Sequence, residues 1–231
     1  MKLEYIFDVD GTLTPSRGTI DPQFKKEFLA FARTHNVYLV TGSDRPKTLE
    51  QVGEEIYNSC KRVYNCSGCD VYEGSTNIRA SHWILPEDAH TWLSVQLTES
   101  KFSLRTGLHF EHRPGMVNFS VVGRNANTDE RARYVEYEIF QPERNRIAEN
   151  FNALFPSLQA RPGGDTGIDI APLGSDKSQI LVDFPVISNI RFYGDRTDVA
   201  GNDFPIASRL NPSHVYSVIG WEHTRGFLLN E

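Results

Sequence analysis

Short apolar segments alternate with segments of helical spacing at both ends of this 231-residue chain, and this alternation limits the possible folds more than any other feature. In the opening third, strands are expected at residues 3–8, 37–40 and 62–65. Asp21 and Pro22 predict a helix start, because aspartate is a common N-cap and proline is tolerated in the first turn. Phenylalanines at helical spacing follow, and a second helix is expected at 45–57. Such alternation is typical of parallel βαβ units.

The middle of the chain has another pattern. A helix is expected from Pro86, strands at 108–111 and 116–122 around a turn at Arg113-Pro114-Gly115, helices at 128–140 and 142–155, and a strand at 167–171. Strands that are joined through turns, with helices on one side, predict an α+β fold.

The last third returns to the first pattern. A helix is expected at 178–182, strands at 187–193 and 215–219, and a closing helix at 222–229. We therefore predict an α/β core made of residues 1–81 and 173–231, interrupted by an α+β cap at residues 82–172.

Composition excludes several classes of function. The chain has 24 Lys and Arg residues against 30 Asp and Glu residues, a net charge of −6. Nucleic acids and anionic membranes need a basic surface, so neither is expected as a partner. No apolar run approaches the roughly 18 residues of a membrane helix, and three cysteines are too few for a disulfide framework. We expect a soluble, cytoplasmic protein.

The strongest chemical signal is the pair of carboxylates Asp8 and Asp10, which directly follows the first strand. Side chains two apart in a strand share a face of the sheet, and open parallel sheets bind ligands beyond the carboxyl ends of their strands. Gly11 lets the chain turn away sharply, so that one acid can be a nucleophile while the other serves a metal or a proton. A solvated turn is the alternative, but it does not explain two acids against an apolar strand.

This motif resembles the Asp-x-Asp-x-Thr hallmark of haloacid dehalogenase (HAD)-like phosphotransferases, and further elements of that family follow in order. Ser43 lies where a strand ends and a helix begins, a place suited to a phosphoryl group. Taken alone, Ser43 could instead be only a helix N-cap. Lys177 would offset negative charge, although a lone lysine is usually a surface residue.

The resemblance implies an α/β fold, with a HAD-like Rossmannoid parallel-sheet core and an inserted α+β cap of type C2. It also implies Mg²⁺ as a cofactor, because hard oxygen ligands suit that ion. The candidate metal ligands are Asp8, Asp10 (through its backbone carbonyl), Asp195, Asn202 and Asp203.

The middle segment is similar to the cap of eukaryotic-type phosphomannomutases. The matching motifs are residues 111–118, 122–124, 129–131 and 163–169, together with 194–203 in the core. In that family three cap arginines, matched by Arg113, Arg124 and Arg131, hold the phosphate that is not transferred. An arginine matched by Arg17 reaches the substrate from the core, and Asn118 and Asp169 are further substrate-binding candidates. Arginine binds small anions through paired hydrogen bonds, although solvated strand-face arginines are the alternative.

Three departures from the family pattern affect the expected specificity. Gly167 stands where the family has serine, so one phosphate or sugar contact is missing. The segment after Asp203 lacks an acidic residue that helps to hold a second cation, and Cys66-Ser67-Gly68 replaces Glu-Asn-Gly.

The resemblance implies an Mg²⁺-dependent phosphotransferase of hexose phosphates, first of all a phosphomannomutase, with a hexose bisphosphate as activator. Asp8 would be the nucleophile, Asp10 the general acid and base, and Ser43 and Lys177 would stabilise the transferring group. A HAD-type sugar-phosphate phosphatase with the same core residues is the alternative. A catalytically idle sugar-phosphate sensor is a third hypothesis, disfavoured because every catalytic position is filled.

Two further interpretations remain open. Cys60, Cys66, Cys69 and His82 resemble a zinc set, but their irregular spacing favours buried or edge thiols. A homodimer through the cap would use apolar side chains such as Trp92 and Tyr134, which core packing explains equally well.

Overall fold

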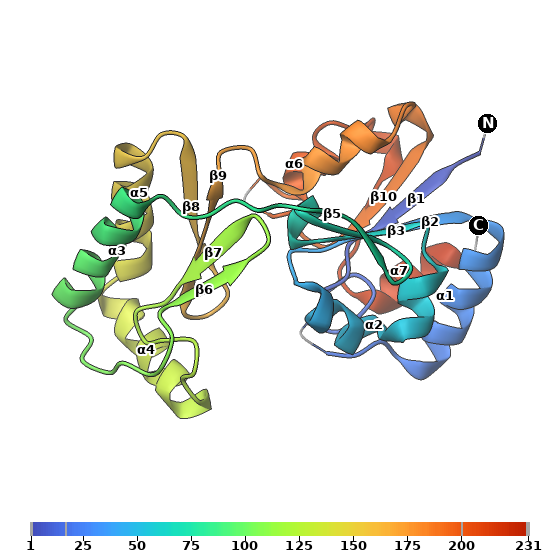
Figure 1. Cartoon of the computed structure of the whole chain (residues 1–231). Coiled ribbons are helices and arrows are strands. Elements are labelled where there is room, and N and C mark those ends of the chain that lie inside the picture. The colour runs from blue at the N-terminus through green and yellow to red at the C-terminus, as the bar shows by residue number, and fades with distance from the viewer. Residues whose placement is uncertain (1, 17, 200, 230–231) are drawn as a thin grey trace. The chain divides into compact units, whose positions relative to one another are not determined.

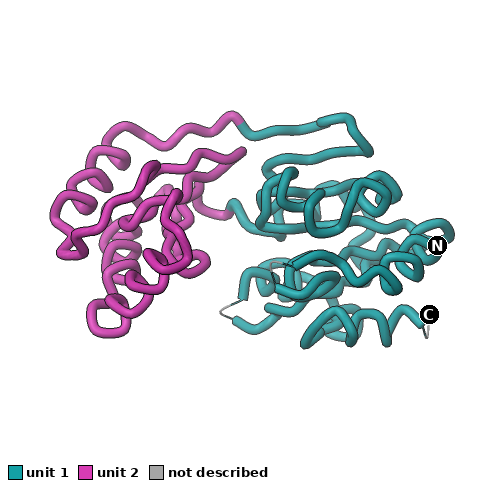
Figure 2. The backbone as a smooth tube through the Cα atoms, turned by 90° about the horizontal axis from the view of Figure 1, so that it is seen from below, with its two compact units in different colours: residues 1–81, 175–231 teal, residues 82–174 magenta. Residues whose placement is uncertain are grey.

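The computed structural model describes residues 2–16, 18–199 and 201–229. The described residues form two compact units, one within residues 1–81 and 175–231 and the other within residues 82–174 (Figure 2). These are called unit 1 and unit 2. Each unit has its own sheet and its own apolar core.

A seven-stranded sheet forms the centre of unit 1 in the described part of the chain, in the order β11-β10-β1-β2-β3-β4-β5. The first five strands in this order are parallel, and β4 and β5 run antiparallel to their neighbours. The strands are β1 (Glu4–Phe7), β2 (Asn36–Val40), β3 (Arg62–Asn65), β4 (Asp70–Glu73), β5 (Thr76–Ala80), β10 (Ile190–Gly194) and β11 (Val215–Ser217).

Helices cover both faces of this sheet (Figure 1). On one face lie α1 (Pro22–Thr34), α2 (Arg45–Ser59) and α7 (Trp221–Leu228), which pack over a core that includes Phe7, Phe24 and Phe28. On the other face lie α6 (Phe204–Ala207) and the 3₁₀ segment η2 (Lys177–Asp183), over Ile6 and Phe192. Both faces of the parallel strands are thus buried, as parallel sheets require.

Local sequence signals set the first helices. The Asp21 carboxylate accepts hydrogen bonds from the N–H groups of Gln23 and Phe24, both at 2.9 Å, with Pro22 in the first turn. The predicted start of α1 is therefore confirmed. Asp44 caps α2 by accepting from the N–H of Lys47 at 3.1 Å.

Unit 2 is an α+β layer structure in which helices cover one face of a four-stranded sheet of order β6-β7-β9-β8 (Figure 1). The strands are β6 (Phe110–Arg113), β7 (Met116–Phe119), β8 (Leu158–Gly163) and β9 (Gly167–Pro172), and the helices are α3 (Glu87–Glu99), α4 (Thr128–Phe140) and α5 (Glu143–Leu154). Neighbouring strands are antiparallel. The predicted fold class, a parallel-sheet α/β core with an α+β insert, is confirmed.

Several elements differ from the sequence-based expectation. The hairpin β4–β5 and strand β8 were not predicted, because β5 is largely exposed and β8 contains Pro162 and Gly163. The strand expected at 187–193 begins only at Ile190, since residues 187–189 form a 3₁₀ turn. In α2, Gly53 adopts a non-helical conformation with φ 78° and ψ 158°.

Candidate active site

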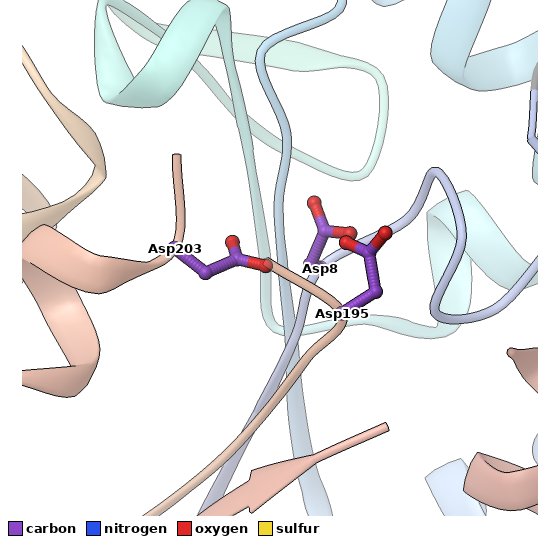
Figure 3. A group of neighbouring side chains, drawn as sticks. All are labelled: Asp8, Asp195 and Asp203. Carbon is purple, nitrogen blue, oxygen red and sulfur yellow. The ribbon is translucent and has the colours of Figure 1, made fainter. Parts of the chain in front are cut away.

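Three carboxylates meet at the carboxyl ends of β1 and β10. Asp8 follows β1, Asp195 follows β10, and Asp203 ends the loop that leads to α6. One oxygen of each carboxylate lies within 4.8 Å of the others, and the three side chains point toward one another in Figure 3. Asp8 and Asp203 are buried and Asp195 is half-buried.

A single ammonium group lies between two of these acids. Nζ of Lys177 donates to Oδ1 of Asp8 at 2.5 Å and to Oδ1 of Asp203 at 2.6 Å. The lysine is 1% exposed, so the alternative of a surface lysine is wrong. Thr12 donates through its hydroxyl to the other Asp8 oxygen at 3.0 Å.

The cluster carries more negative than positive charge, and its pKa values reflect this. Burial is the main cause that raises the pKa of Asp8 to about 7; Lys177 opposes it, while Asp203 and Asp195 add to it. Burial, followed by the charge of Asp203, raises the pKa of Asp195. Burial alone would lower the pKa of Lys177, but Asp8 and Asp203 outweigh it and raise that pKa. Without a bound cation, the positive charge of Lys177 is therefore too small to offset the burial of these carboxylates.

These residues fit a magnesium ion by their donor chemistry. Mg²⁺ prefers oxygen ligands and is commonly held by one or two carboxylates together with substrate oxygens. Among the described residues, Asp8, Asp195 and Asp203 form the one group of three or more His, Cys, Asp or Glu side chains able to hold a metal. A divalent cation would also balance the excess negative charge.

Gly11 permits the close approach of two chain segments at this cluster. It has φ +87°, a conformation that favours glycine, and a Cβ at this position would lie 2.4 Å from Oδ2 of Asp195. Asp10, half-buried, instead accepts a hydrogen bond on Oδ1 from Nε2 of Gln51 at 2.9 Å. The second acid of the motif thus has surroundings different from those of the first.

The loop between β2 and α2 carries the predicted residue Ser43. The N–H of Ser43 donates to the Thr41 hydroxyl at 3.1 Å, and Asp44 caps the helix. The interpretation of Ser43 as a mere N-cap is therefore wrong. Among the described residues, the Ser43 hydroxyl has no hydrogen-bonding partner, so it is available to a ligand at the start of α2.

In unit 2, a glutamate connects two of the three predicted arginines. Glu111 pairs with the guanidinium of Arg113 at 2.8 Å and also with that of Arg124. Burial raises the pKa of Glu111, but the two guanidinium groups outweigh it and lower that pKa. Arg131 donates to the carbonyls of Ala126 and Arg124 at 3.0 and 3.2 Å.

The remaining predicted residues of unit 2 form a tight pair. Nδ2 of Asn118 donates to Oδ1 of Asp169 at 2.6 Å, across the paired strands β7 and β9. A Cβ at Gly167 would lie 2.4 Å from Nδ2 of Asn118, and one at Gly163 would lie 2.1 Å from Oδ2 of Asp169. A side chain at either glycine would therefore require the Asn118–Asp169 pair to shift.

The other predicted residues have different outcomes. Asn202 is exposed, and Arg17 lies outside the described residues. Tyr134 is fully buried in the core of unit 2, so its suggested role at a dimer surface is wrong. Gln51 and Glu111, which contact predicted site residues, were missed; the signal for Gln51 was a polar residue on the buried face of a helix.

Comparison with known proteins identifies the family of this chain. The family model described as eukaryotic phosphomannomutase matches residues 25–228. The chain belongs to the eukaryotic phosphomannomutase family. The phosphomannomutase of Saccharomyces cerevisiae is 33% identical over 211 residues, which are 87% of this chain and 83% of the yeast protein. Phosphomannomutase 1 of Dictyostelium discoideum is 31% identical over 234 residues, 96% of this chain and 94% of that protein.

Solved structures agree with the fold of this phosphomannomutase-family chain. The C-terminal domain of a Candida albicans trehalose-6-phosphate phosphatase has a TM-score of 0.64 at 13% identity, covering 99% of this chain and 93% of that one. An IMP-nucleotidase of Plasmodium falciparum has the same TM-score at 15% identity, covering 99% and 68%. A haloacid dehalogenase-like hydrolase of Bacteroides thetaiotaomicron has a TM-score of 0.58 at 12% identity, covering 91% of this chain and 86% of that one, which confirms the HAD-like fold.

The structure also bears on the expected absence of membrane-spanning helices and on the state of the three cysteines. Across residues 2–16, 18–199 and 201–229, no helix is long and apolar enough to cross a membrane. Cys60, Cys66 and Cys69 are free thiols, and burial raises the pKa of Cys60 to about 12.

Proposed function

We propose that this chain interconverts mannose 1-phosphate and mannose 6-phosphate through a phosphoryl group carried on Asp8. The observation that supports this most strongly is the contact of the buried Asp8 carboxylate with Lys177 and Thr12, beside Asp195 and Asp203. Membership of the phosphomannomutase family adds the substrate.

Each residue near β1 has a separate part in this reaction. Asp8 attacks the phosphorus atom, and the bond from phosphorus to the sugar oxygen breaks. Asp10 gives its proton to that oxygen and later takes the proton of the accepting hydroxyl. Lys177 offsets the charge of the transferring group, and the Ser43 hydroxyl donates a hydrogen bond to it. Asp8, Asp195, Asp203 and the backbone carbonyl of Asp10 would hold Mg²⁺, which supplies positive charge to the phosphoryl oxygens.

A mutase must also hold a second phosphate. We propose that Arg113, Arg124 and Arg131 bind the phosphate that is not transferred, with Arg17, Asn118 and Asp169 as further substrate contacts. Guanidinium groups suit this part because they bind phosphate through two parallel hydrogen bonds. The phosphoenzyme then transfers its phosphoryl group to the free hydroxyl of a hexose monophosphate, which gives a hexose bisphosphate. The bisphosphate turns round in the site and gives the phosphoryl group at its other end to Asp8, which releases the isomeric monophosphate. A hexose bisphosphate is therefore the activator, because it forms the phosphoenzyme.

The product decides between the mutase and a phosphatase. The chain is incubated with mannose 1-phosphate, Mg²⁺ and a catalytic amount of a hexose bisphosphate. Formation of mannose 6-phosphate, followed by ³¹P NMR, is expected. Release of inorganic phosphate alone would show a phosphatase with the same core residues, and parallel incubation with glucose phosphates measures the choice of sugar.

Asp8→Asn distinguishes an enzyme from a sensor. The variant keeps the size of the side chain but loses the nucleophile, so turnover should fall by at least about 10³-fold while binding of mannose 1-phosphate persists. Unchanged turnover would contradict the mechanism.

Three expectations stay predictions. They are a homodimer through unit 2, which light scattering would test, a cytoplasmic location, and the effect of Gly167 on sugar specificity.

A further inference from the structure

Gln51 contacts the segment that carries Asp10 at three points. Its side chain is 1% exposed, and its Nε2 donates to Oδ1 of Asp10 at 2.9 Å and to Oγ1 of Thr14 at 3.3 Å. Its backbone carbonyl accepts the N–H of Ile20 at 2.8 Å. One residue of α2 therefore holds both ends of the segment from Asp10 to Ile20.

A break in α2 makes the third contact possible. In an uninterrupted helix the carbonyl of Gln51 would accept from the N–H four residues later. Gly53, with φ 78° and ψ 158°, is outside the helical region and ends that ladder two residues after Gln51. The freed carbonyl is the one that binds Ile20.

The amide oxygen of Gln51 is further evidence that this side chain is oriented toward Asp10. Its Oε1 is buried without a hydrogen-bonding partner among the described residues, an arrangement that destabilises the folded chain. If the amide were turned over, Oε1 would face the Asp10 carboxylate, acceptor against acceptor. The observed orientation thus favours the contact with Asp10 at the expense of Oε1.

We propose that Gln51 is the positioning residue for Asp10, and that it holds the Asp10 carboxyl where it can exchange a proton with the sugar oxygen. This rests on the proposed function. In the step concerned, Asp8 forms a bond to phosphorus, the bond from phosphorus to the sugar oxygen breaks, and its electron pair stays on that oxygen. The oxygen takes the proton of Asp10, so that the sugar departs as a neutral alcohol and Asp10 remains as a carboxylate.

A change of leaving group separates this role from a structural one. The sugar alkoxide is a poor leaving group and needs the proton of Asp10. With acetyl phosphate as the donor to Asp8, the bond from phosphorus to the acetate oxygen would break instead, and the electron pair would stay on acetate, which is stable without a proton. A displaced Asp10 therefore slows only the first reaction.

The experiment measures single-turnover phosphorylation of the full chain with Mg²⁺, followed by release of mannose from mannose 1-phosphate and of acetate from acetyl phosphate. Gln51→Leu and Gln51→Met remove the donor and keep an apolar side chain of similar size. For both variants we expect about a 10- to 100-fold loss with mannose 1-phosphate, a change of less than about twofold with acetyl phosphate, and little change in KM.

Two controls make the outcome specific. Gln96→Leu removes another buried glutamine, in α3, and should leave both rates unchanged. Asp10→Asn should show the same preference for acetyl phosphate as the Gln51 variants, at larger amplitude.

Two results would overturn the inference in different ways. If Asp10→Asn slows both reactions equally, the proposed role of Asp10 is wrong and the role of Gln51 falls with it. If Asp10→Asn discriminates but both Gln51 variants slow the two reactions equally, or neither, only the inference about Gln51 is wrong. A folding defect in the Gln51 variants would lower both rates together, and this result would likewise contradict the inference about Gln51.

Discussion

Binding of Mg²⁺ should weaken about tenfold when the pH is lowered from 8 to 6. The cause lies at Asp8, whose pKa burial raises to about 7 despite the opposing charge of Lys177. The cation needs the carboxylate form, so the proton must leave Asp8 before metal binds.

The magnitude follows from one titrating group. With a pKa of about 7 for Asp8, the apparent dissociation constant is multiplied by 1 + 10^(pKa − pH), which is about 11 at pH 6 and about 1.1 at pH 8. In the metal-free chain, the same titration of Asp8 changes the free energy of unfolding. The folded state keeps a proton that the unfolded state, with its ordinary pKa of 3.8, has lost. The free energy of unfolding should therefore fall by about 1.4 kcal/mol from pH 6 to pH 8.

Titration calorimetry in two buffers of different ionisation enthalpy measures both quantities. We expect about 0.9 proton released per Mg²⁺ at pH 6 and about 0.1 at pH 8. Asp8→Asn is the control, because it removes the titrating group and should abolish this proton release. An affinity independent of pH, without proton release at pH 6, would refute the reasoning.

Three other changes have definite expected results. Lys177→Met leaves two buried carboxylates without their ammonium and should lower the free energy of unfolding by about 3–5 kcal/mol at pH 8, less at pH 6, where Asp8 is protonated; an equal loss at both pH values would speak against it. Gly11→Ala places a methyl group against Asp195 and should weaken Mg²⁺ binding at least about tenfold, measured by calorimetry. An unchanged affinity would show that the turn does not depend on glycine. Glu111→Ala frees two guanidinium groups and should raise KM about tenfold with a smaller change in kcat, whereas an unchanged KM would show that the pairing does not orient them.

Much of the acid cluster could be predicted because its signals are local. Asp8 and Asp10 directly follow an apolar strand, and Asp195 follows another. The contact of Lys177 with Asp8 spans 169 positions, and only the family resemblance predicted that it would serve this site. No spacing rule shows that Asp203 binds the same ammonium group.

The elements that were missed lack a clear pattern of apolar residues. β5 is exposed along most of its length, so no alternation marks it, although Gly74 and Ser75 form the kind of two-residue turn that joins hairpins. The role of Gln51 depends on the break at Gly53, which frees its backbone carbonyl. A single glycine in a helical pattern does not indicate where that carbonyl will bind.

The division of work between Ser43 and Asp44 has a consequence for the thermodynamics of substrate binding. Asp44 completes the start of α2 in the absence of any ligand, and the Ser43 hydroxyl is left free among the described residues. The loop is therefore ordered before a phosphate arrives, so the entropy of ordering it does not weaken the complex. Association with a sugar phosphate should accordingly proceed as for a rigid receptor, with a heat capacity change set by the buried ligand surface rather than by folding of the loop.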